Sequence, residues 1–262
     1  WQMREFNSVD EVLRQVEYFV DALSDYKSDF AVFPEFFNAS LMGLTDQTDQ
    51  TKAIRFLAAF TEKFRDEMSQ MAVSYNINIV AGSMPLFEDD RIYNVSYLCH
   101  RDGRIDEQRK IHITPHERRD WVIEGGNELG VFDTDAGRVM IQICYDVEFP
   151  EVSRSLAMNG ADTIVTISAN MRPCVRDQEL YHGTRALENG CPHVLCNRVG
   201  EERGVDFFGR SGIVTHRGRR ILSLGADVVE ASTGHVPLDP DRSQSHDYLG
   251  DRQPALYDLA SE

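Results

Sequence analysis

The sequence predicts a single layered α/β domain with a mixed β-sheet. Helical and strand patterns alternate along most of the 262 residues, and hairpin-like patterns follow near the end. Such alternation is typical of α/β domains, and the two kinds of connection produce both parallel and antiparallel strand pairs. No Ser/Pro/Gly-rich linker, internal repeat or low-complexity tract divides the chain, so we expect one domain over residues 1–262.

The first half of the chain begins with a clear helix signal. Ser8 and Glu11 have the spacing of a capping box, and apolar residues then recur at helical spacing as far as Leu23. Only seven residues precede this helix, so we expect a first strand that is truncated at the N-terminus. A second helix is expected over residues 51–71, and apolar runs predict strands over residues 30–33, 77–82, 95–99 and 109–113.

The second half repeats the alternation. Helices are expected over residues 150–158 and 178–189, because Asn159-Gly160 and Gly190 are typical helix ends. Apolar runs predict strands over residues 139–144, 163–167 and 194–196, and hairpin strands over residues 212–214, 220–224 and 235–238.

Composition excludes several classes of protein. A hydrophobic content of 42% excludes a disordered chain. The 27 Lys and Arg against 43 Asp and Glu give a net charge of −16, which argues against nucleic acid as the main partner. No apolar run approaches the ~20 residues that cross a membrane. Five cysteines without a CxxC pair indicate a reducing compartment, so we expect a cytoplasmic protein without a disulfide framework.

Three expected strands end in or beside a reactive side chain. Glu35 follows the first apolar run, Lys110 lies at a later one, and Cys144 ends a third before a turn and a helix. A carboxylate can take the thiol proton, the sulfur can attack a carbonyl or nitrile carbon, and an ammonium group can stabilise the resulting oxyanion. Taken alone, each residue also fits a structural role, as a helix-capping acid, a surface cation and a core thiol respectively.

The local strings around these residues resemble the signature blocks of the nitrilase superfamily, also called carbon–nitrogen hydrolases. Lys110 and Cys144 are 34 positions apart, and the blocks occur in the usual order of that family. The blocks are Phe33-Pro34-Glu35, Arg109-Lys110-Ile111-His112, Cys144-Tyr145-Asp146-Val147-Glu148-Phe149-Pro150-Glu151, Arg185-Ala186-Leu187-Glu188-Asn189, Asn197-Arg198-Val199-Gly200 and Phe208-Gly209-Arg210-Ser211-Gly212.

The resemblance implies a role for each of these residues. Glu35 is implied as the general base, Lys110 as the oxyanion stabiliser and Cys144 as the nucleophile that forms a thioester. The backbone N–H of Tyr145 is implied as a second oxyanion donor. Glu117 occupies the place of a second glutamate that positions substrate and water, although a solvated loop acid is the alternative.

The resemblance also implies an architecture. It is a four-layer αββα sandwich that pairs into an αββα–αββα dimer, so we expect a homodimer or a higher homo-oligomer. We also expect no cofactor. Residues 25–29 and 110–115 are similar to bacterial members that are sometimes fused to an acetyltransferase domain. Family members that hydrolyse carbamoyl amino acids have arginines directly after the Cys-x-Asp motif. Val147 and Glu148 stand there instead, which disfavours that substrate class.

Three further residues are candidates for substrate binding. Asn170 could line the pocket or cap a turn. Arg172 could bind a substrate carboxylate or form surface ion pairs with acids such as Asp177 or Glu179. Trp121 could form part of the pocket wall or pack in the core.

Other chemistries have weaker signals. His112 and His116 are four residues apart, but Pro115 is expected to prevent a helix between them, and no HExxH motif exists. Neither a G-x-S-x-G motif nor a nucleotide-binding glycine motif is present, so we expect no metal and no nucleotide cofactor.

The sequence therefore predicts an enzyme that hydrolyses a small non-peptide amide and releases ammonia or an amine. An N-carbamoyl amine hydrolase, a nitrilase and an enzyme that transfers the acyl group to an amine remain alternatives within the family. An inactive binding or scaffold protein with this fold is the alternative from another class.

Overall fold

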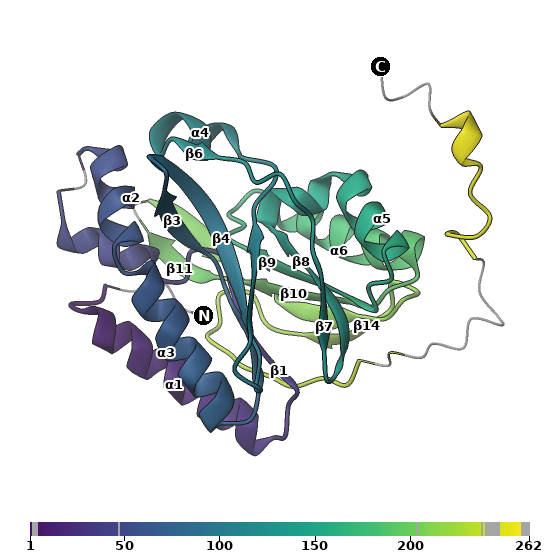
Figure 1. Ribbon diagram of the computed structural model, residues 1–262, viewed down its shortest axis with the longest axis horizontal. Coiled ribbons are helices and arrows are strands. Elements are labelled where there is room, and N and C mark those ends of the chain that lie inside the picture. Colours follow the sequence, from purple (N-terminus) through teal and green to yellow (C-terminus); the bar gives the residue numbers. More distant parts are fainter. Residues whose placement is uncertain (2–4, 47, 203, 237, 239–246, 258–262) are drawn as a thin grey trace.

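Two six-stranded sheets form the middle layers of the computed structural model, which describes residues 1, 5–46, 48–202, 204–236, 238 and 247–257 (Figure 1). Helices cover the outer face of each sheet, so the order of layers is αββα, as expected. Both sheets are mixed, because parallel and antiparallel pairs occur in each.

The first sheet has the order β1-β2-β4-β3, with β5 and β6 also pairing with β4. Its edge strand β1 pairs with β2 in parallel, Phe30 opposite Asn78. The strands are β1 (Phe30–Phe33), β2 (Asn78–Ala81), β3 (Met84–Glu88), β4 (Arg91–Cys99), β5 (Ile105–Arg109) and β6 (Ile123–Glu124).

The second sheet has the order β14-β13-β10-β9-β8-β7, and its central strands β8, β9 and β10 are parallel. A separate hairpin joins β11 to β12. These strands are β7 (Val131–Thr134), β8 (Gly137–Ile143), β9 (Thr163–Ser168), β10 (His193–Asn197), β11 (Val199–Glu202), β12 (Val205–Phe208), β13 (Gly212–Val214) and β14 (Arg220–Ser223).

The helices divide between the two sheets. On one side α1 and α3 lie next to each other on the first sheet, and on the other side α5 and α6 pack against the second (Figure 1). The helices are α1 (Val9–Asp25), α2 (Gln50–Ala58), α3 (Thr61–Ser74), α4 (Pro115–Asp120), α5 (Pro150–Met158) and α6 (Val175–Asn189). No helix among the described residues has both the length and the apolar content needed to span a membrane.

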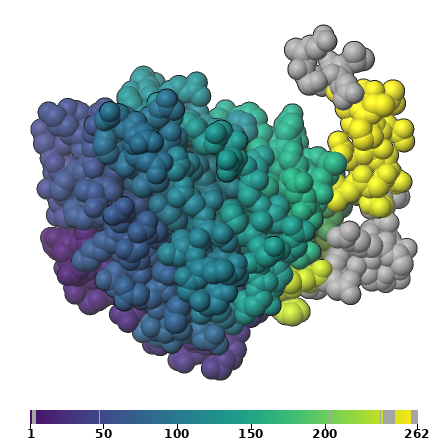
Figure 2. Space-filling view, in the orientation of Figure 1, coloured from purple at the N-terminus to yellow at the C-terminus, as the bar shows by residue number. Residues whose placement is uncertain are grey.

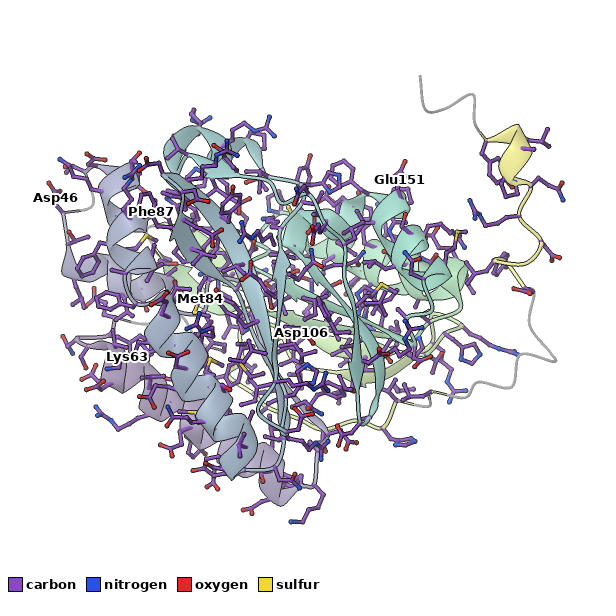
Figure 3. All side chains as sticks on the ribbon, in the orientation of Figure 1. Asp46, Lys63, Met84, Phe87, Asp106 and Glu151 are labelled. Atoms are coloured by element: carbon purple, nitrogen blue, oxygen red, sulfur yellow. The ribbon has the colours of Figure 1, made fainter. Side chains whose placement is uncertain are left out.

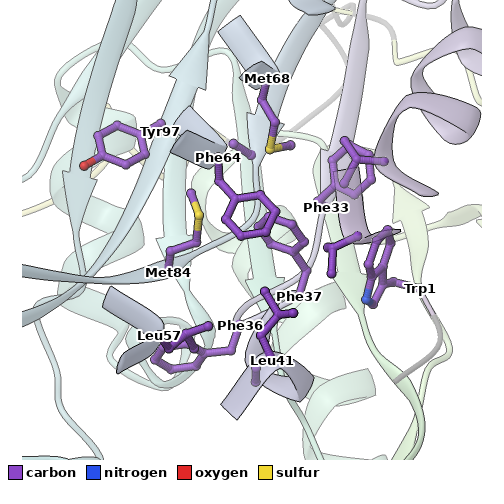
Figure 4. Packing of buried hydrophobic residues seen from close by; sticks show 14 of the residues in the cluster. Trp1, Phe33, Phe36, Phe37, Leu41, Leu57, Phe64, Met68, Met84 and Tyr97 are labelled. Atoms are coloured by element: carbon purple, nitrogen blue, oxygen red, sulfur yellow. The ribbon is translucent and has the colours of Figure 1, made fainter. Parts of the chain in front are cut away.

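Three apolar clusters fill the spaces between the four layers. The largest joins α1 and α3 to the first sheet, and Figure 4 shows Phe37 and Phe64 at its centre with Trp1 at its side. The second lies between the sheets, and the third joins β8 and β9 to α5. Central strands such as β9 are therefore buried on both faces and read as continuous apolar runs in the sequence.

Charged side chains gather on the outside of these layers. Figure 3 shows Asp46 and Glu151 at the periphery, whereas Met84 lies in the interior and is fully buried. Residues 247–257 lie at one edge of the molecule in Figure 2, and their Leu249 packs against the cluster beneath α5.

The first helix begins almost as predicted. The Ser8 hydroxyl accepts a hydrogen bond from the N–H of Glu11 at 3.3 Å. The carboxylate of Glu11, however, accepts from the N–H of Asn7 at 2.9 Å rather than from that of Ser8. The truncated strand expected ahead of this helix falls partly on residues 2–4, which lie outside the described residues.

Three predicted elements were wrong in extent. The helix expected over residues 51–71 is two helices, α2 and α3, because the first packs on β3 and the second on β2 and β4. The strand expected over residues 109–113 is β5, which occupies Ile105–Arg109 instead. The turn after β4 is short, so pairing starts at Ile105 opposite Cys99 and ends at Arg109 opposite Val95. In the described part of residues 235–238 there is no strand.

No helix connects His112 to His116, as predicted. Pro115 is instead the first residue of α4, and Thr114 is its N-cap. The first residue of a helix has no intrahelical acceptor for its N–H, so proline is well tolerated there.

Candidate active site

Glu35 lies two residues beyond the end of β1 and is 3% exposed. The next residue, Phe36, has a φ of +47°, an unusual conformation for a bulky side chain. Two side chains hold this bend: the Ser83 hydroxyl accepts from the Phe36 N–H at 3.3 Å, and Arg198 Nη1 donates to the Phe36 carbonyl at 3.0 Å. The conformation of the loop after β1 is therefore fixed by groups from outside it.

Lys110 directly follows β5 and is 1% exposed. Its N–H donates to the Asn94 carbonyl at 2.8 Å, and its carbonyl accepts from the Gly126 N–H at 2.8 Å. With its main chain held on both sides, the ammonium group donates to Glu35 Oε1 at 2.8 Å and to Glu117 Oε2 at 2.7 Å. The structure thus brings together three of the predicted residues in one buried ion cluster.

Glu117 reaches this cluster from the first turn of α4 and is 4% exposed. Its Oε2 accepts from the N–H of Thr114 at 3.0 Å and from the Thr114 hydroxyl at 2.8 Å. A capping box therefore fixes the same carboxylate that binds Lys110. The alternative of a solvated loop acid does not fit this burial.

Asn94 of β4 completes the cluster, and sequence reasoning missed it. Its Nδ2 donates to Glu35 Oε1 at 2.9 Å and to Glu117 Oε1 at 3.0 Å, and the residue is fully buried. One amide group therefore holds both carboxylates around Lys110. A signal did exist, because an asparagine between apolar residues of a buried strand must find polar partners.

The charges of this cluster stabilise one another. Burial would lower the pKa of Lys110, but the attraction of Glu35 and Glu117 outweighs it and raises that pKa. Burial would raise the pKa of Glu117, but the ammonium group of Lys110 reverses this and lowers it. Lys110 and Glu117 are consequently both charged at neutral pH.

Cys144 lies at the end of β8, where a 3-10 turn over Cys144–Glu148 begins. Its φ is +48°, so the strand changes direction sharply at this residue. A strained strand-to-helix turn of this kind projects its side chain out of the sheet. Tyr145 is the next residue, at the start of a helical turn, where backbone N–H groups lack intrahelical acceptors.

Asp146 ties the cysteine turn to the loop that carries Lys110. Its carboxylate accepts from the N–H of Ile143 at 3.3 Å on its own side, and from the N–H groups of Ile111 at 3.4 Å and His112 at 2.8 Å across the site. The aspartate is 1% exposed. These bonds hold the end of β8 and the loop after β5 in a fixed relation.

The thiol of Cys144 has a neutral partner and several charged neighbours. Its Sγ–H donates to Asn170 Oδ1 at 3.3 Å. Burial raises the pKa of the Cys144 thiol well above its usual value, the negative charge of Glu35 raises it further, and Lys110 offsets only part of this. The resting group is therefore a thiol rather than a thiolate, and it needs a base to become a nucleophile.

Two of the predicted substrate-binding residues make their described contacts elsewhere. Arg172 is about half exposed, and its guanidinium donates to Asp206 at 2.7 Å and to Asp227 at 2.6 Å. Its partners are thus not the two acids expected, and its charge is already neutralised. The Trp121 ring lies edge-on to the Phe36 ring, with the ring centres 5.1 Å apart, and packs against the largest apolar cluster.

The histidines of α4 and the preceding loop also have partners. His112 Nδ1 lies 3.0 Å from Asp146 Oδ1, and His116 Nδ1 lies 2.6 Å from Asp120 Oδ2. Across the described ranges of the chain, no three His, Cys, Asp or Glu side chains are grouped so that they could hold a metal ion.

A groove of about 900 Å³ lies apart from this site. It lies between β1 and strands of the second sheet and is lined by Leu23, Phe30, Val32 and Val194, but by none of the reactive residues described above. The candidate active site is therefore identified by its chemistry and not by the size of a cavity.

Sequence comparison assigns the chain to a family. The sequence profile described as carbon-nitrogen hydrolase matches residues 1–244. The chain belongs to the carbon-nitrogen hydrolase family. A Bacillus subtilis (strain 168) protein named "Probable hydrolase YhcX" is 42% identical over 223 residues, 81% of this chain and 42% of that protein. The chain thus spans less than half the length of this relative.

Other members of the carbon-nitrogen hydrolase family extend the comparison. An (R)-stereoselective amidase of a Pseudomonas species is 30% identical over 231 residues, which are 86% of this chain and 80% of that enzyme. The crystal structure of a carbon-nitrogen hydrolase from Helicobacter pylori G27 superimposes with a TM-score of 0.86 and 21% identity, covering 99% of this chain and 95% of that one. At that identity the structural match supports the fold alone.

Proposed function

We propose that this chain hydrolyses the carbon–nitrogen bond of a small non-peptide amide, with Cys144 as the nucleophile. The observation that carries the proposal is the buried cluster of Glu35, Lys110 and Glu117, whose charges act on the Cys144 thiol. A base, a cation and a thiol are the groups that acyl transfer through a thioester needs. Relatives named as amidases support the same reaction class.

The first half of the reaction forms the thioester. Glu35 takes the thiol proton, and the sulfur of Cys144 bonds to the carbonyl carbon while the carbonyl oxygen becomes an oxyanion. Lys110 and the N–H of Tyr145 stabilise that oxyanion. When it collapses, the carbon–nitrogen bond breaks, Glu35 returns the proton to the nitrogen, and ammonia or an amine leaves.

The second half releases the acid. Glu35 takes a proton from water, and the hydroxide attacks the thioester carbon. The carbon–sulfur bond then breaks, and Glu35 returns the proton to the sulfur, which regenerates the thiol and the base. Glu35 suits this role because Lys110 and Asn94 both bond to its Oε1. Among the described residues none donates a hydrogen bond to its Oε2, which leaves that oxygen to exchange protons. Glu117 holds Lys110 in place.

The charges near the cysteine favour a substrate without a carboxylate. Glu148 closes the turn that Cys144 begins, and burial together with the nearby Asp177 raises the pKa of its carboxyl group. Two acids at this position repel an anion, and Arg172 is occupied by its own acidic partners. N-carbamoyl amines, nitriles and transfer of the acyl group to an amine remain variants of the proposal.

We infer in addition that the enzyme forms a homodimer or higher homo-oligomer in the cytoplasm. The outer helices of the second sheet expose apolar side chains, namely Met158, Leu180 and Leu187, which a second copy could cover. Five free cysteines suit a reducing compartment. Sedimentation velocity tests the oligomer, and a purely monomeric protein at micromolar concentration would contradict it.

A panel of short amides, carbamoyl amines and nitriles tests the reaction through the release of ammonia. We expect release from an amide that disappears in Cys144→Ala, and an acyl adduct on Cys144 in intact-mass spectra. Cys174→Ala is the matched control, because this thiol is also partly buried but lies outside the cluster. Equal ammonia release from wild type and Cys144→Ala would remove Cys144 from the mechanism.

A further inference from the structure

Three neutral amide side chains lie behind the Cys144 thiol. Asn170 follows β9, Gln178 lies in the first turns of α6, and Asn197 ends β10. Gln178 and Asn197 are 4% and 1% exposed, while Asn170 is only partly buried. They connect the sulfur to the backbone of the loop after β12, at Gly209.

This chain of hydrogen bonds has a fixed direction. Backbone carbonyls can only accept, so the side-chain nitrogen of Gln178 must face the carbonyls of Gly209, at 3.1 Å, and Arg210, at 3.4 Å. Its Oε1 therefore faces Asn170, whose Nδ2 donates to it at 2.9 Å. Asn170 is left with only its carbonyl oxygen to present to Cys144.

The backbone of Asn170 is fixed separately. Its N–H donates to Asn197 Oδ1 at 2.8 Å, and its carbonyl accepts from Asn197 Nδ2 at 3.2 Å. Asn197 also donates to the Gly209 carbonyl at 3.0 Å. Asn197 thus determines where Asn170 lies, whereas Gln178 determines which end of its amide group faces the sulfur.

A hydrogen-bond acceptor beside the nucleophile selects among substrates. When Sγ attacks the substrate carbonyl carbon, the atoms bonded to that carbon come within hydrogen-bonding reach of Asn170 Oδ1, which lies 3.3 Å from Sγ. Lys110 and the Tyr145 N–H are donors and suit the carbonyl oxygen, whereas the Asn170 oxygen suits an N–H on the same carbon. Amides carry such an N–H, but esters and nitriles do not.

We propose that Asn170 accepts a hydrogen bond from the nitrogen of the scissile amide, and that Gln178 is the positioning residue that makes this possible by fixing the Asn170 side-chain orientation. The proposal rests on the amide hydrolysis proposed above and specifies its substrate class as amides with at least one N–H. The thiol hydrogen occupies the Asn170 oxygen in the free enzyme and leaves it when Glu35 takes that proton.

The test compares propionamide with methyl propionate, which yield the same acyl-enzyme and differ in the N–H. The ratio of kcat/KM for amide to ester is measured in wild type, in Gln178→Met and in Asn170→Leu. We expect both variants to lower this ratio about tenfold, which corresponds to one hydrogen bond of about 1.4 kcal/mol. The kcat/KM for the ester should change less than the kcat/KM for the amide.

Two further variants separate orientation from stability. Gln142→Met is the matched control, because Gln142 is a fully buried glutamine of β8 that bonds to Ser153 and Thr166 instead of the site. It should lower the melting temperature without changing the amide-to-ester ratio. With its carboxyl group protonated, Gln178→Glu can donate to the Gly209 carbonyl and accept from Asn170 Nδ2, so under those conditions it should preserve the ratio that Gln178→Met loses. Asn170→Leu keeps the test valid if Gln178→Met does not fold.

The outcomes distinguish this inference from the function on which it rests. If both substrates depend on Cys144 but amide and ester rates fall equally in Gln178→Met and Asn170→Leu, the orientation role is wrong and the hydrolase proposal stands. If neither substrate shows turnover that Cys144→Ala abolishes, the proposed hydrolysis of small amides itself fails.

Discussion

The two sheets contribute different kinds of chemistry to the candidate active site. The first sheet and its loops supply charged groups, Glu35, Lys110 and Glu117, which bind one another directly. The second sheet supplies a neutral thiol, Cys144, held by the amide of Asn170. The Asp146 bonds join the two sides.

This difference shows how a buried site can hold reactive groups without a substrate. Buried charges are costly unless they are paired, and on the first sheet both buried carboxylates pair with the ammonium group of Lys110. A buried thiol costs little while it stays protonated, and the second sheet provides only an uncharged acceptor for its hydrogen. In the proposed mechanism, the reaction begins when one proton passes from the thiol of Cys144 to Glu35.

The charged side should fail most severely when its cation is removed. Lys110→Met leaves two carboxylates buried without a counter-ion, so we expect a loss of about 3–5 kcal/mol in the free energy of unfolding. We also expect kcat/KM to fall by a factor of about 10² or more, because an oxyanion donor is lost. Urea unfolding and amide kinetics measure the two effects. Lys63→Met, at an exposed ion pair with Asp10, should leave the free energy of unfolding nearly unchanged.

In acid, the second sheet and its helices should lose stability before the ion cluster of the first sheet does. His182 and His193 are buried at the contact of α6 with β10, and burial lowers the pKa of His182 to about 4. The unfolded chain binds protons below its histidine pKa of about 6.5 and the folded chain does not, so stability is complete above pH 6.5 and falls towards pH 4. The lowered pKa of His182 alone corresponds to about 3 kcal/mol of unfolding free energy, which is lost as the pH falls from 6.5 to 4.

His182→Gln tests this assignment, because glutamine can donate to the His193 carbonyl in place of the imidazole. The fall in stability between pH 6.5 and 4.5 should become shallower in this variant. Since the pKa of Glu117 is lowered in the fold, its contribution is lost only below the ordinary glutamate range. An unchanged profile in His182→Gln would mean that the early loss arises elsewhere.

Removing Asn94 should weaken the charged side by a smaller amount. Asn94→Leu deletes one donor to each of Glu35 and Glu117, and we expect a loss of about 1–3 kcal/mol in unfolding free energy. A fall of about tenfold in kcat/KM should accompany it, because Glu35 is then less well positioned. Ser96→Ala on the same strand is the control, since no described group bonds the Ser96 hydroxyl. Equal effects of the two variants would exclude a positioning role for Asn94.

The smallest effect is expected at Arg172, which belongs to neither side. Arg172→Ala removes two exposed ion pairs, with Asp206 and Asp227, and should leave the free energy of unfolding nearly unchanged because solvent screens them. Because its charge is already neutralised, kcat/KM for a neutral amide should stay within about twofold of wild type. A large rise in KM for propionamide would return Arg172 to the binding site.

The sequence predicted the parts of this molecule that depend on neighbouring residues. The central strands and the bounds of α5 follow from local apolar patterns, and the structure has them. Glu35, Lys110 and Cys144 were found as a set because each stands at a strand end within a recognisable block. Pro115 excludes a helix between His112 and His116, as predicted, but the short helix that it begins, α4, was not predicted.

The remainder depends on contacts between distant residues. Asn94 and Glu35 are 59 positions apart, and Gln178 reaches carbonyls 31 and 32 positions away. A polar residue within an apolar pattern predicts that it has a hydrogen-bond partner, but it does not identify that partner. The division of the charged and neutral groups between two sheets is therefore visible only in the folded chain.

The ion cluster also gives the proposed reaction a direction. Two carboxylates share one ammonium group, so the formal charge of Glu35, Lys110 and Glu117 together is negative by one. An amide enters as a neutral molecule, but the acid formed from it ionises at neutral pH and is repelled at short range in a poorly screened site. Product inhibition by the carboxylate should be weak, because the same charges that activate the thiol expel what it makes.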